Sequence, residues 1–307
     1  MIMVRNRYAI WKVRGTYCYR AYQICCYQEQ QLKPVEPMVF SNHVLSVALA
    51  LCTLCIAPVV THAAPLVVQA ESGQEKVAVL ELYTSEGCSS CPPADQFVSR
   101  LGVSGWYPRQ VVPLSFHVTY WDYIGWRDMY AQEMFEKRQR DIAARQHSRS
   151  VYTPQLVMDG VDVRGFGRFG RQLRTINQRL PEAKIGLQVS SVDGKALQLD
   201  LNVDVGDAKQ RAGSALYIAL YENGLSSQVN AGENSGKTLT HDYVVREFIG
   251  PLELLLNKAD SHHRLSIDVP NGVNLDKAGV AAFVQNTSDG RVLQALATPL
   301  VSSSAMP

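Results

Sequence analysis

The order of apolar and polar residues first predicts a strand, a helix and a second strand. Residues 77–83 read Val-Ala-Val-Leu-Glu-Leu-Tyr, a run of strand-forming residues that ends at a Thr-Ser-Glu-Gly turn. A Pro-Pro-Ala-Asp sequence then opens a helix that reaches about Leu101. Residues 111–117, Val-Val-Pro-Leu-Ser-Phe-His, indicate a second buried strand. This order predicts two parallel strands joined by a helix.

The pattern then predicts a second helix, a hairpin and a third helix. Residues 126–147 are mostly charged, with apolar positions spaced to cover one face of a helix. Residues 153–164 indicate two short strands joined by an Asp-Gly turn. Residues 168–180 are typical of a last helix, which ends before Pro181.

Beyond residue 183 the pattern changes to short alternating strands. The alternating segments, separated by Asp-Gly and Asn-Gly turns, include residues 197–203, 215–221 and 264–269. This pattern predicts an antiparallel β-sandwich, while residues 247–258 fit either a short helix or a loop. We expect residues 184–307 to fold without the preceding domain and to contribute no redox chemistry, because they contain no cysteine.

One uncharged apolar run indicates export. Residues 44–60 carry no charge and are followed by Thr-His-Ala-Ala, whose small residues suit a signal peptidase. We therefore expect cleavage after Ala63, with Met38 as the start of translation. The alternative is an uncleaved anchor behind a basic cytoplasmic tail. The predicted division is an upstream extension and signal peptide over residues 1–63, a first domain over residues 70–183 and a second over residues 184–307.

Charge limits the partners. The net charge is +2 and 19% of the residues are charged, a composition that is neither disordered nor strongly basic. We therefore expect no nucleic acid partner, and membrane contact only if the apolar run stays uncleaved. The expected location is secreted or periplasmic, in a bacterial cell envelope.

Removal of the signal segment leaves one pair of cysteines. Five of the seven lie before Ala64, and only Cys88 and Cys91 follow it. Two cysteines three residues apart in an exported protein form either a redox couple or half of a metal site. At a strand-to-helix turn, unpaired backbone N–H groups and the helix dipole lower a thiol pKa, so we expect Cys88 to be the exposed nucleophile. Cys91, one turn on, would resolve the mixed disulfide.

The position of this pair is typical of a known fold. A C-x-x-C at the first strand-helix junction, followed by a Thr-Pro that opens the hairpin, resembles the thioredoxin fold over roughly residues 77–180. The stretches LELYTSEGCSSCPPAD, SFHVTYWDYIGW and VYTPQLVMDG resemble an uncharacterised family of secreted thioredoxin-like proteins, domain of unknown function 1223. The fold class that we expect is therefore an α/β thioredoxin-like domain followed by an all-β sandwich domain.

The resemblance also departs from the usual pattern. Thioredoxin relatives commonly place an aromatic residue before the first cysteine, whereas Gly87 precedes it here. Two prolines follow the second cysteine, and they place the helix start near Pro93. The nearby Glu86 also opposes a thiolate. We therefore expect a weaker depression of the Cys88 pKa than in strongly activated pairs.

Other candidate binding residues lie near this pair. The resemblance implies a cis bond before Pro154, which leaves the backbone of Thr153 free to bind an extended substrate. His117 ends the second parallel strand, and ligands gather at the carboxyl ends of such strands. The residues that we expect to contact substrate are Thr153, Pro154, His117, Trp121 and Asp122.

Three functions fit these residues. The leading hypothesis is an exported thiol-disulfide oxidoreductase that acts on protein or small-molecule disulfides and thiols and needs no cofactor or bound metal. The rival is a copper carrier in which Cys88, Cys91 and His117 hold Cu(I). The third is a thioredoxin-like scaffold that only binds partners. The sequence leaves the direction of the redox reaction open, because it depends on how the reduced thiolate is stabilised.

Overall fold

The first apolar run forms the buried strand β2 (Ala78–Thr84), in which every residue is buried. The parallel strand β3 (Val111–His117) pairs with it on one side and the antiparallel strand β4 (Gln155–Met158) on the other. A strand covered on both faces reads as a continuous apolar run, which is why the sequence showed it clearly. The computed structural model describes residues 66–301, so the predicted signal segment and its cleavage site lie outside the described residues.

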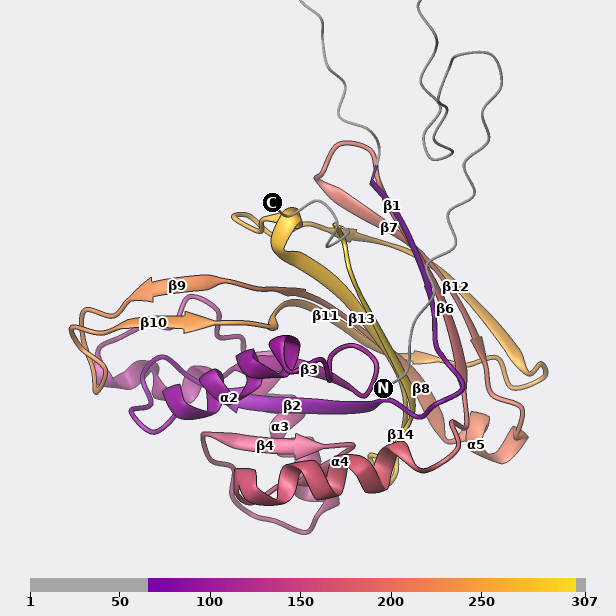
Figure 1. Cartoon of the computed structure of the whole chain (residues 1–307), viewed down its shortest axis with the longest axis horizontal. Helices are drawn as coiled ribbons and strands as arrows, with labels where there is room; N and C mark the ends of the chain where they lie inside the picture. The colour runs from indigo at the N-terminus through magenta and orange to yellow at the C-terminus, as the bar shows by residue number, and fades with distance from the viewer. Residues whose placement is uncertain (1–65, 302–307) are drawn as a thin grey trace, which may run out of the picture. The chain divides into compact units, whose positions relative to one another are not determined.

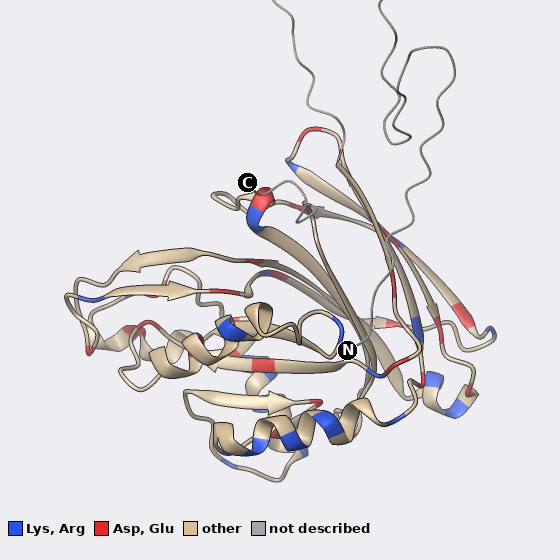
Figure 2. Cartoon of the chain, in the orientation of Figure 1, with Lys and Arg blue, Asp and Glu red and all other residues tan. Residues whose placement is uncertain are grey.

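Three longer helices follow the predicted order. They are α2 (Pro92–Val103), α3 (Glu133–Arg145) and α4 (Phe169–Asn177), the last carrying the Arg residues seen in blue in Figure 2. Helix α2 begins at Pro92, where the missing N–H of proline costs no helical hydrogen bond. The start of α3 lies seven residues later than predicted, after the short 3₁₀ helix η1 (Thr119–Ile124).

The predicted Asp-Gly hairpin is confirmed. Strand β4 turns into β5 (Val161–Asp162), and the two strands pair antiparallel. The turn residues Asp159 and Gly160 have φ of 47° and 78°. Positive φ at both central residues is the signature of the type I′ turn that an Asp-Gly sequence favours.

The sheet around β2 extends far into the C-terminal half of the chain. Its order is β14-β13-β8-β11-β3-β2-β4-β5, and all of these strands except β5 are labelled in Figure 1. The added strands are β8 (Ser214–Glu222), β11 (Val244–Glu253), β13 (Ala278–Asn286) and β14 (Val292–Pro299). Strand β11 occupies part of the segment for which the sequence suggested a helix or a loop.

A second sheet packs on one face of these added strands. It comprises β1 (Leu66–Glu71), β6 (Lys184–Ser191), β7 (Ala196–Asp204) and β12 (Asp260–Asp268), in the order β1-β6-β7-β12. Alternate residues of β8, among them Leu216 and Ile218, face β6 and β7 in one core. Their neighbours Tyr217 and Ala219 face the core that contains β2 and the helices. The expected face-to-face packing of two sheets is therefore present.

The predicted boundary at residue 183 does not separate two sheets. The described residues 66–301 lie within one compact unit, and the Ser115 N–H of β3 donates to the Tyr243 carbonyl just before β11 at 2.8 Å. Strand β1, from the other side of the boundary, pairs with β6. The physical reason is that β8 and β13 are apolar on both faces, so each needs cover from both halves of the chain.

The remaining elements are short. Strands β9 (Leu225–Gln228) and β10 (Thr238–His241) form a two-stranded ribbon, and α5 (Ala208–Ala212), η2 (Phe166–Arg168) and η3 (Leu275–Lys277) complete the chain. The loop of residues 229–237, which joins β9 to β10, is called the cover loop below. Within residues 66–301, no helix is long and apolar enough to cross a membrane.

Candidate functional site

The two cysteines occupy the predicted junction and form a disulfide. Cys88 lies four residues after the end of β2, and Cys91 is the N-cap of α2. The backbone N–H of Cys91 donates to the Cys88 carbonyl at 3.2 Å, so the two residues lie within one turn. Their Cα atoms are 5.4 Å apart, within the usual range for a bonded pair.

Both cysteines are buried, which corrects the expectation that Cys88 is exposed. Each has 0% of its surface accessible, whereas Ser89 and Ser90 between them are exposed. The cause is the close packing of η1 against the cysteine turn. A Cβ atom added to Gly87 would lie 3.1 Å from Cβ of Trp121, so only glycine fits here without a shift.

The cover loop also holds the cysteine turn. The side-chain amide of Asn234 donates to the carbonyls of Glu86 and Cys88 at 2.8 and 3.0 Å. The backbone N–H of Ser89 donates to Glu233 at 3.0 Å. The C-terminal segment, expected to stand apart from the chemistry, therefore contributes directly to the surroundings of the disulfide.

His117 ends β3 as predicted and is fixed by a buried carboxylate. Its Nδ1 lies 2.7 Å from Oδ2 of Asp128, and both residues are almost fully buried. Asp128 also accepts hydrogen bonds from the backbone N–H groups of Glu86 and Tyr130. Burial opposes ionisation of Asp128, but His117 and these hydrogen bonds outweigh it and lower the pKa. Because Nδ1 of His117 faces Asp128, its Nε2 points into the interior.

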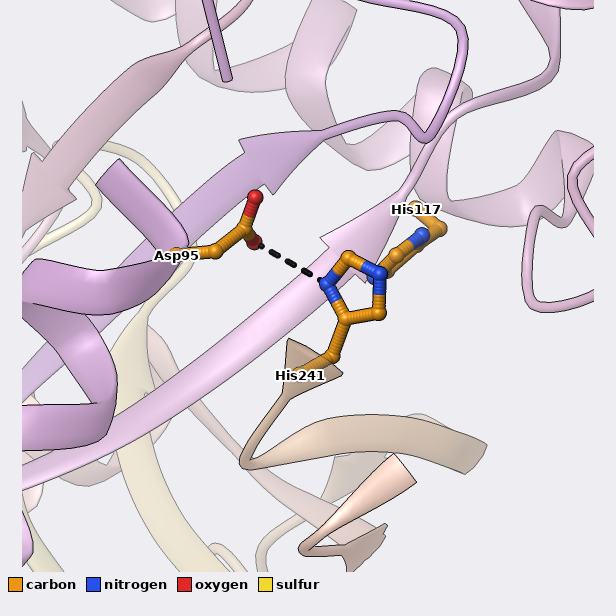
Figure 3. Close-up of side chains that lie close together, drawn as sticks. All are labelled: Asp95, His117 and His241. Atoms are coloured by element: carbon orange, nitrogen blue, oxygen red, sulfur yellow. Dashed lines mark ion pairs between the residues drawn. The ribbon is translucent and has the colours of Figure 1, made fainter. Parts of the chain in front are cut away.

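A second buried histidine, His241 of β10, lies between two carboxylates. Its Nδ1 is 3.5 Å from Oδ1 of Asp95, the ion pair drawn in Figure 3, and its Nε2 is 3.4 Å from Oε1 of Glu86. Burial lowers the pKa of His241, but the two carboxylates outweigh it and raise the pKa to about 10. Burial also opposes ionisation of Glu86, whose contacts with His241, Ser227 and Trp126 nevertheless lower its pKa.

The segment before β4 lies against the cysteine turn through Trp121. The indole N–H of Trp121 donates to Oγ1 of Thr153 at 2.7 Å, while its Cβ lies beside Gly87. The Thr153–Pro154 bond is cis, as the resemblance implied. A groove of about 640 Å³ begins here, lined among others by Pro154, Tyr152 and Ala94 of α2.

The structure separates the expected substrate-binding residues into two groups. Trp121, Thr153 and Pro154 lie together between the cysteine turn and the groove. His117 is completely buried, and Asp122 accepts a hydrogen bond from the Asp128 N–H at 3.2 Å. His117 is therefore part of the buried polar cluster, whereas the half-buried Asp122 lies at its edge.

Sequence reasoning missed several members of this buried cluster. They are Asp95, Asp128, Asn234 and His241. The sequence carries one weak signal for His241, because Leu239 and His241 share the inward positions of an alternating strand. Only the fold brings these residues to the cysteines.

The fold and the site define a mixed α/β protein, dominated by sheets, with a buried C-x-x-C disulfide beside a polar cluster. The chain belongs to the family described as "Protein of unknown function (DUF1223)", which matches residues 79–285. None of the curated proteins matches the chain.

Two solved structures have a similar fold. A protein from Agrobacterium tumefaciens is 23% identical, with a TM-score of 0.56 over 75% of this chain and 98% of its own. HBP35 of Porphyromonas gingivalis is 13% identical, with a TM-score of 0.59 over 77% of this chain and 79% of its own. At these identities the similarity concerns the fold alone.

Proposed function

We propose that the protein is an exported thiol-disulfide oxidoreductase built on a thioredoxin-like arrangement. The observation that carries the proposal is the position of the Cys88–Cys91 disulfide, at the carboxyl end of β2 and the first turn of α2. Three further features support a thioredoxin-like arrangement. They are the parallel pair β2 and β3, the antiparallel β4 and the cis bond before Pro154. Because so short a loop adds little stability, a purely structural role explains the pair less well.

The exchange proceeds in two balanced steps. A thiolate of a dithiol substrate attacks Sγ of Cys88, forms a mixed disulfide with it and expels Cys91 as a thiolate. The second thiolate of the substrate attacks its own sulfur in the mixed disulfide and expels Cys88. The substrate leaves as a disulfide, two electrons pass to the protein, and the cysteines take up the two protons that the substrate lost. A disulfide oxidant reverses these steps.

Cys88 is the sulfur that a substrate reaches first. Its Sγ lies 3.3 Å from the hydroxyl of Ser90, which is exposed, whereas Cys91 sits at the start of α2. The Asp95 N–H donates to the Cys91 carbonyl at 3.2 Å, so Asp95 lies one turn beyond Cys91 in α2.

The environment favours a reducing pair. The first residues of α2 are Pro92 and Pro93, which carry no N–H to donate to a thiolate. The buried Glu86 adds negative charge two residues before Cys88. A poorly stabilised thiolate makes the dithiol a better reductant, so the equilibrium lies further toward the disulfide than in strongly oxidising pairs.

Trapping of mixed disulfides tests the proposal. The variant Cys91→Ser keeps a nucleophile without a resolving thiol, so incubation with oxidised glutathione should convert most of it to a stable glutathione adduct seen by mass spectrometry. The matched variant Cys88→Ser should form at least about tenfold less adduct, because Cys91 lies at the start of α2 whereas Cys88 lies beside the exposed Ser90. Equal trapping by both variants would refute the assigned roles. Absence of trapping in both folded variants would refute the redox function.

A further inference from the structure

The polar cluster behind the disulfide holds an unusual number of unsatisfied atoms. In residues 66–301, the buried side-chain atoms without a hydrogen-bond partner include Glu86 Oε1, Asp95 Oδ1, His117 Nε2 and both ring nitrogens of His241. An unpartnered buried polar atom costs about 1–3 kcal/mol, so such groups need an explanation. Asp95, His117 and His241 each offer one ligand atom, and these atoms lie within 4.8 Å of one another.

The outward side of each group is fixed by a second residue. Nδ1 of His117 faces Asp128 at 2.7 Å, and Nε2 of His241 faces Glu86 at 3.4 Å. The other carboxylate oxygen of Asp95, Oδ2, accepts a hydrogen bond from the Thr84 hydroxyl at 3.2 Å. A carboxylate on one ring nitrogen of a histidine leaves the lone pair of the other nitrogen for a metal ion, and this pairing recurs in metal sites.

The spacing of the inward atoms suits a small ion. Bond lengths of 2.0–2.2 Å in a tetrahedral zinc site place two ligand atoms about 3.4 Å apart. Nδ1 of His241 and Oδ1 of Asp95 are 3.5 Å apart. Figure 3 shows that Asp95 comes from the helix, while the two histidines come from separate strands. The three ligand atoms therefore come from three separate elements that meet at one point.

The excess of negative charge in the buried cluster also favours a bound cation. Glu86, Asp95 and Asp128 are all at least 95% buried. Across the part of the chain that the structure describes, their ion pairs within 4 Å are with His117 and His241, and none is with Lys or Arg. Buried charges need pairing or a metal, and a divalent ion would balance this excess of carboxylates.

We propose that Asp95, His117 and His241 bind a divalent cation of the zinc type, with water as the fourth ligand. Two imidazoles and one carboxylate with an open position form a donor set that zinc accepts and that Mg²⁺ and Ca²⁺ disfavour. A cavity of about 50 Å³, lined by Asp95, His241 and Thr240 among others, borders the site and has room for a water molecule. The proposal uses no sulfur atom, so it stands apart from the thiol chemistry.

Zinc titration of the oxidised protein tests the site. Protein treated with EDTA and then freed of it should bind one Zn²⁺ per chain in competition with a chromophoric chelator, and zinc should raise the Tm. Asp95→Asn and His241→Gln should each weaken binding by more than about 100-fold, and Asp128→Asn by about 10–100-fold. His262→Gln, which alters an exposed histidine of β12, should bind as the original protein does.

Two further variants keep the test decisive. Thr84→Val removes only the hydrogen bond to Asp95 and should weaken binding about tenfold, even if Asp95→Asn fails to fold. The double variant Cys88→Ser/Cys91→Ser should bind zinc unchanged, because neither sulfur is a ligand. Absence of stoichiometric binding by the original protein, full affinity in folded His241→Gln, or loss of binding in the double cysteine variant would each overturn the proposal.

Discussion

Protonation of His241 contributes to the stability of the folded protein, because carboxylates flank its ring. Glu86 and Asp95 flank its two nitrogens, the ring of His117 lies 4.9 Å away, and Tyr130 is the next aromatic neighbour. The carboxylates outweigh burial and raise the pKa of His241 from 6.5 to about 10. In the metal-free folded protein, His241 is therefore protonated at neutral pH.

This shift predicts a loss of stability at alkaline pH. The pKa of His241 is higher in the folded state than in the unfolded state. Its contribution to the free energy of unfolding is therefore fully present below pH 6.5 and disappears as pH rises toward about 10. Its size is on the order of 4 kcal/mol. Urea unfolding in EDTA, measured between these limits, should show this decline in the original protein and a flatter profile in His241→Gln. Parallel profiles for the two proteins would show that His241 is not the group responsible.

At the residue scale, the sequence identified the functional residues that lie close together along the chain. It missed those that only the folded chain brings together. Cys88 and Cys91 stand three apart, and their place at a strand end follows from the preceding apolar run. His241 lies 150 residues beyond Cys91, as their numbers in the sequence show, and nothing near it marks a site. The burial of Cys88 could not be predicted either, because the contacts of the cysteine turn with η1 and with the cover loop arise only in the folded chain.

At the scale of elements, the cover loop controls access to the disulfide. Asn234 is completely buried and donates to two carbonyls of the cysteine turn. Asn234→Ala removes one hydrogen-bond donor from each of these carbonyls and should lower the free-energy cost of local opening by about 1–3 kcal/mol. The rate at which dithiothreitol reduces the native disulfide should then rise about tenfold.

The matched control for this prediction is Asn230→Ala, which changes an exposed asparagine of the same loop. Reduction of this variant should proceed at the original rate. An unchanged rate in Asn234→Ala, with the fold intact by circular dichroism, would show that the loop does not limit access.

The close packing of β8 against β13 predicts that one added methyl group at Gly279 lowers the stability of the protein. A Cβ at Gly279 would lie 2.1 Å from the hydroxyl of Tyr221, which is itself hydrogen-bonded to Tyr107. Gly279→Ala should therefore destabilise the protein by about 2–4 kcal/mol in urea unfolding. Gly206→Ala, where an added Cβ meets nothing within 4 Å, should change stability by less than about 1 kcal/mol. Similar values for both variants would contradict the packing described.

Strand β11 is among the elements that the sequence did not predict, and the reason is local. Gly250 has φ of 132° and precedes Pro251, and the pairing of β11 with β8 shifts register there. Glycine and proline inside a strand usually mark an irregularity, so the pattern looked like a helix or a loop. The neighbouring strand β8 has no such interruption, and its apolar run was visible in the sequence.

At the scale of the whole molecule, the shared sheet predicts that residues 184–307 do not fold alone. Tyr217, Phe248 and Phe283 pack under Arg138 of α3, whose guanidinium pairs with Glu81 of β2. Cutting the chain at residue 183 exposes this apolar face and removes β1 from the second sheet. Residues 184–307 should show no cooperative unfolding, whereas residues 62–307 should unfold in one transition. A cooperative transition of the shorter chain would restore the two-domain interpretation drawn from the sequence.

The redox potential of the Cys88–Cys91 pair tests the central proposal most directly. The measurement is the fraction of folded protein in the dithiol form after equilibration with glutathione or dithiothreitol buffers of defined potential. We expect reversible exchange with a potential toward the reducing end of catalytic pairs, near about −270 mV, because Pro92, Pro93 and Glu86 leave the thiolate poorly stabilised. A pair that stays oxidised below about −300 mV, or that is reduced only as the protein unfolds, would be a structural disulfide and would contradict the account.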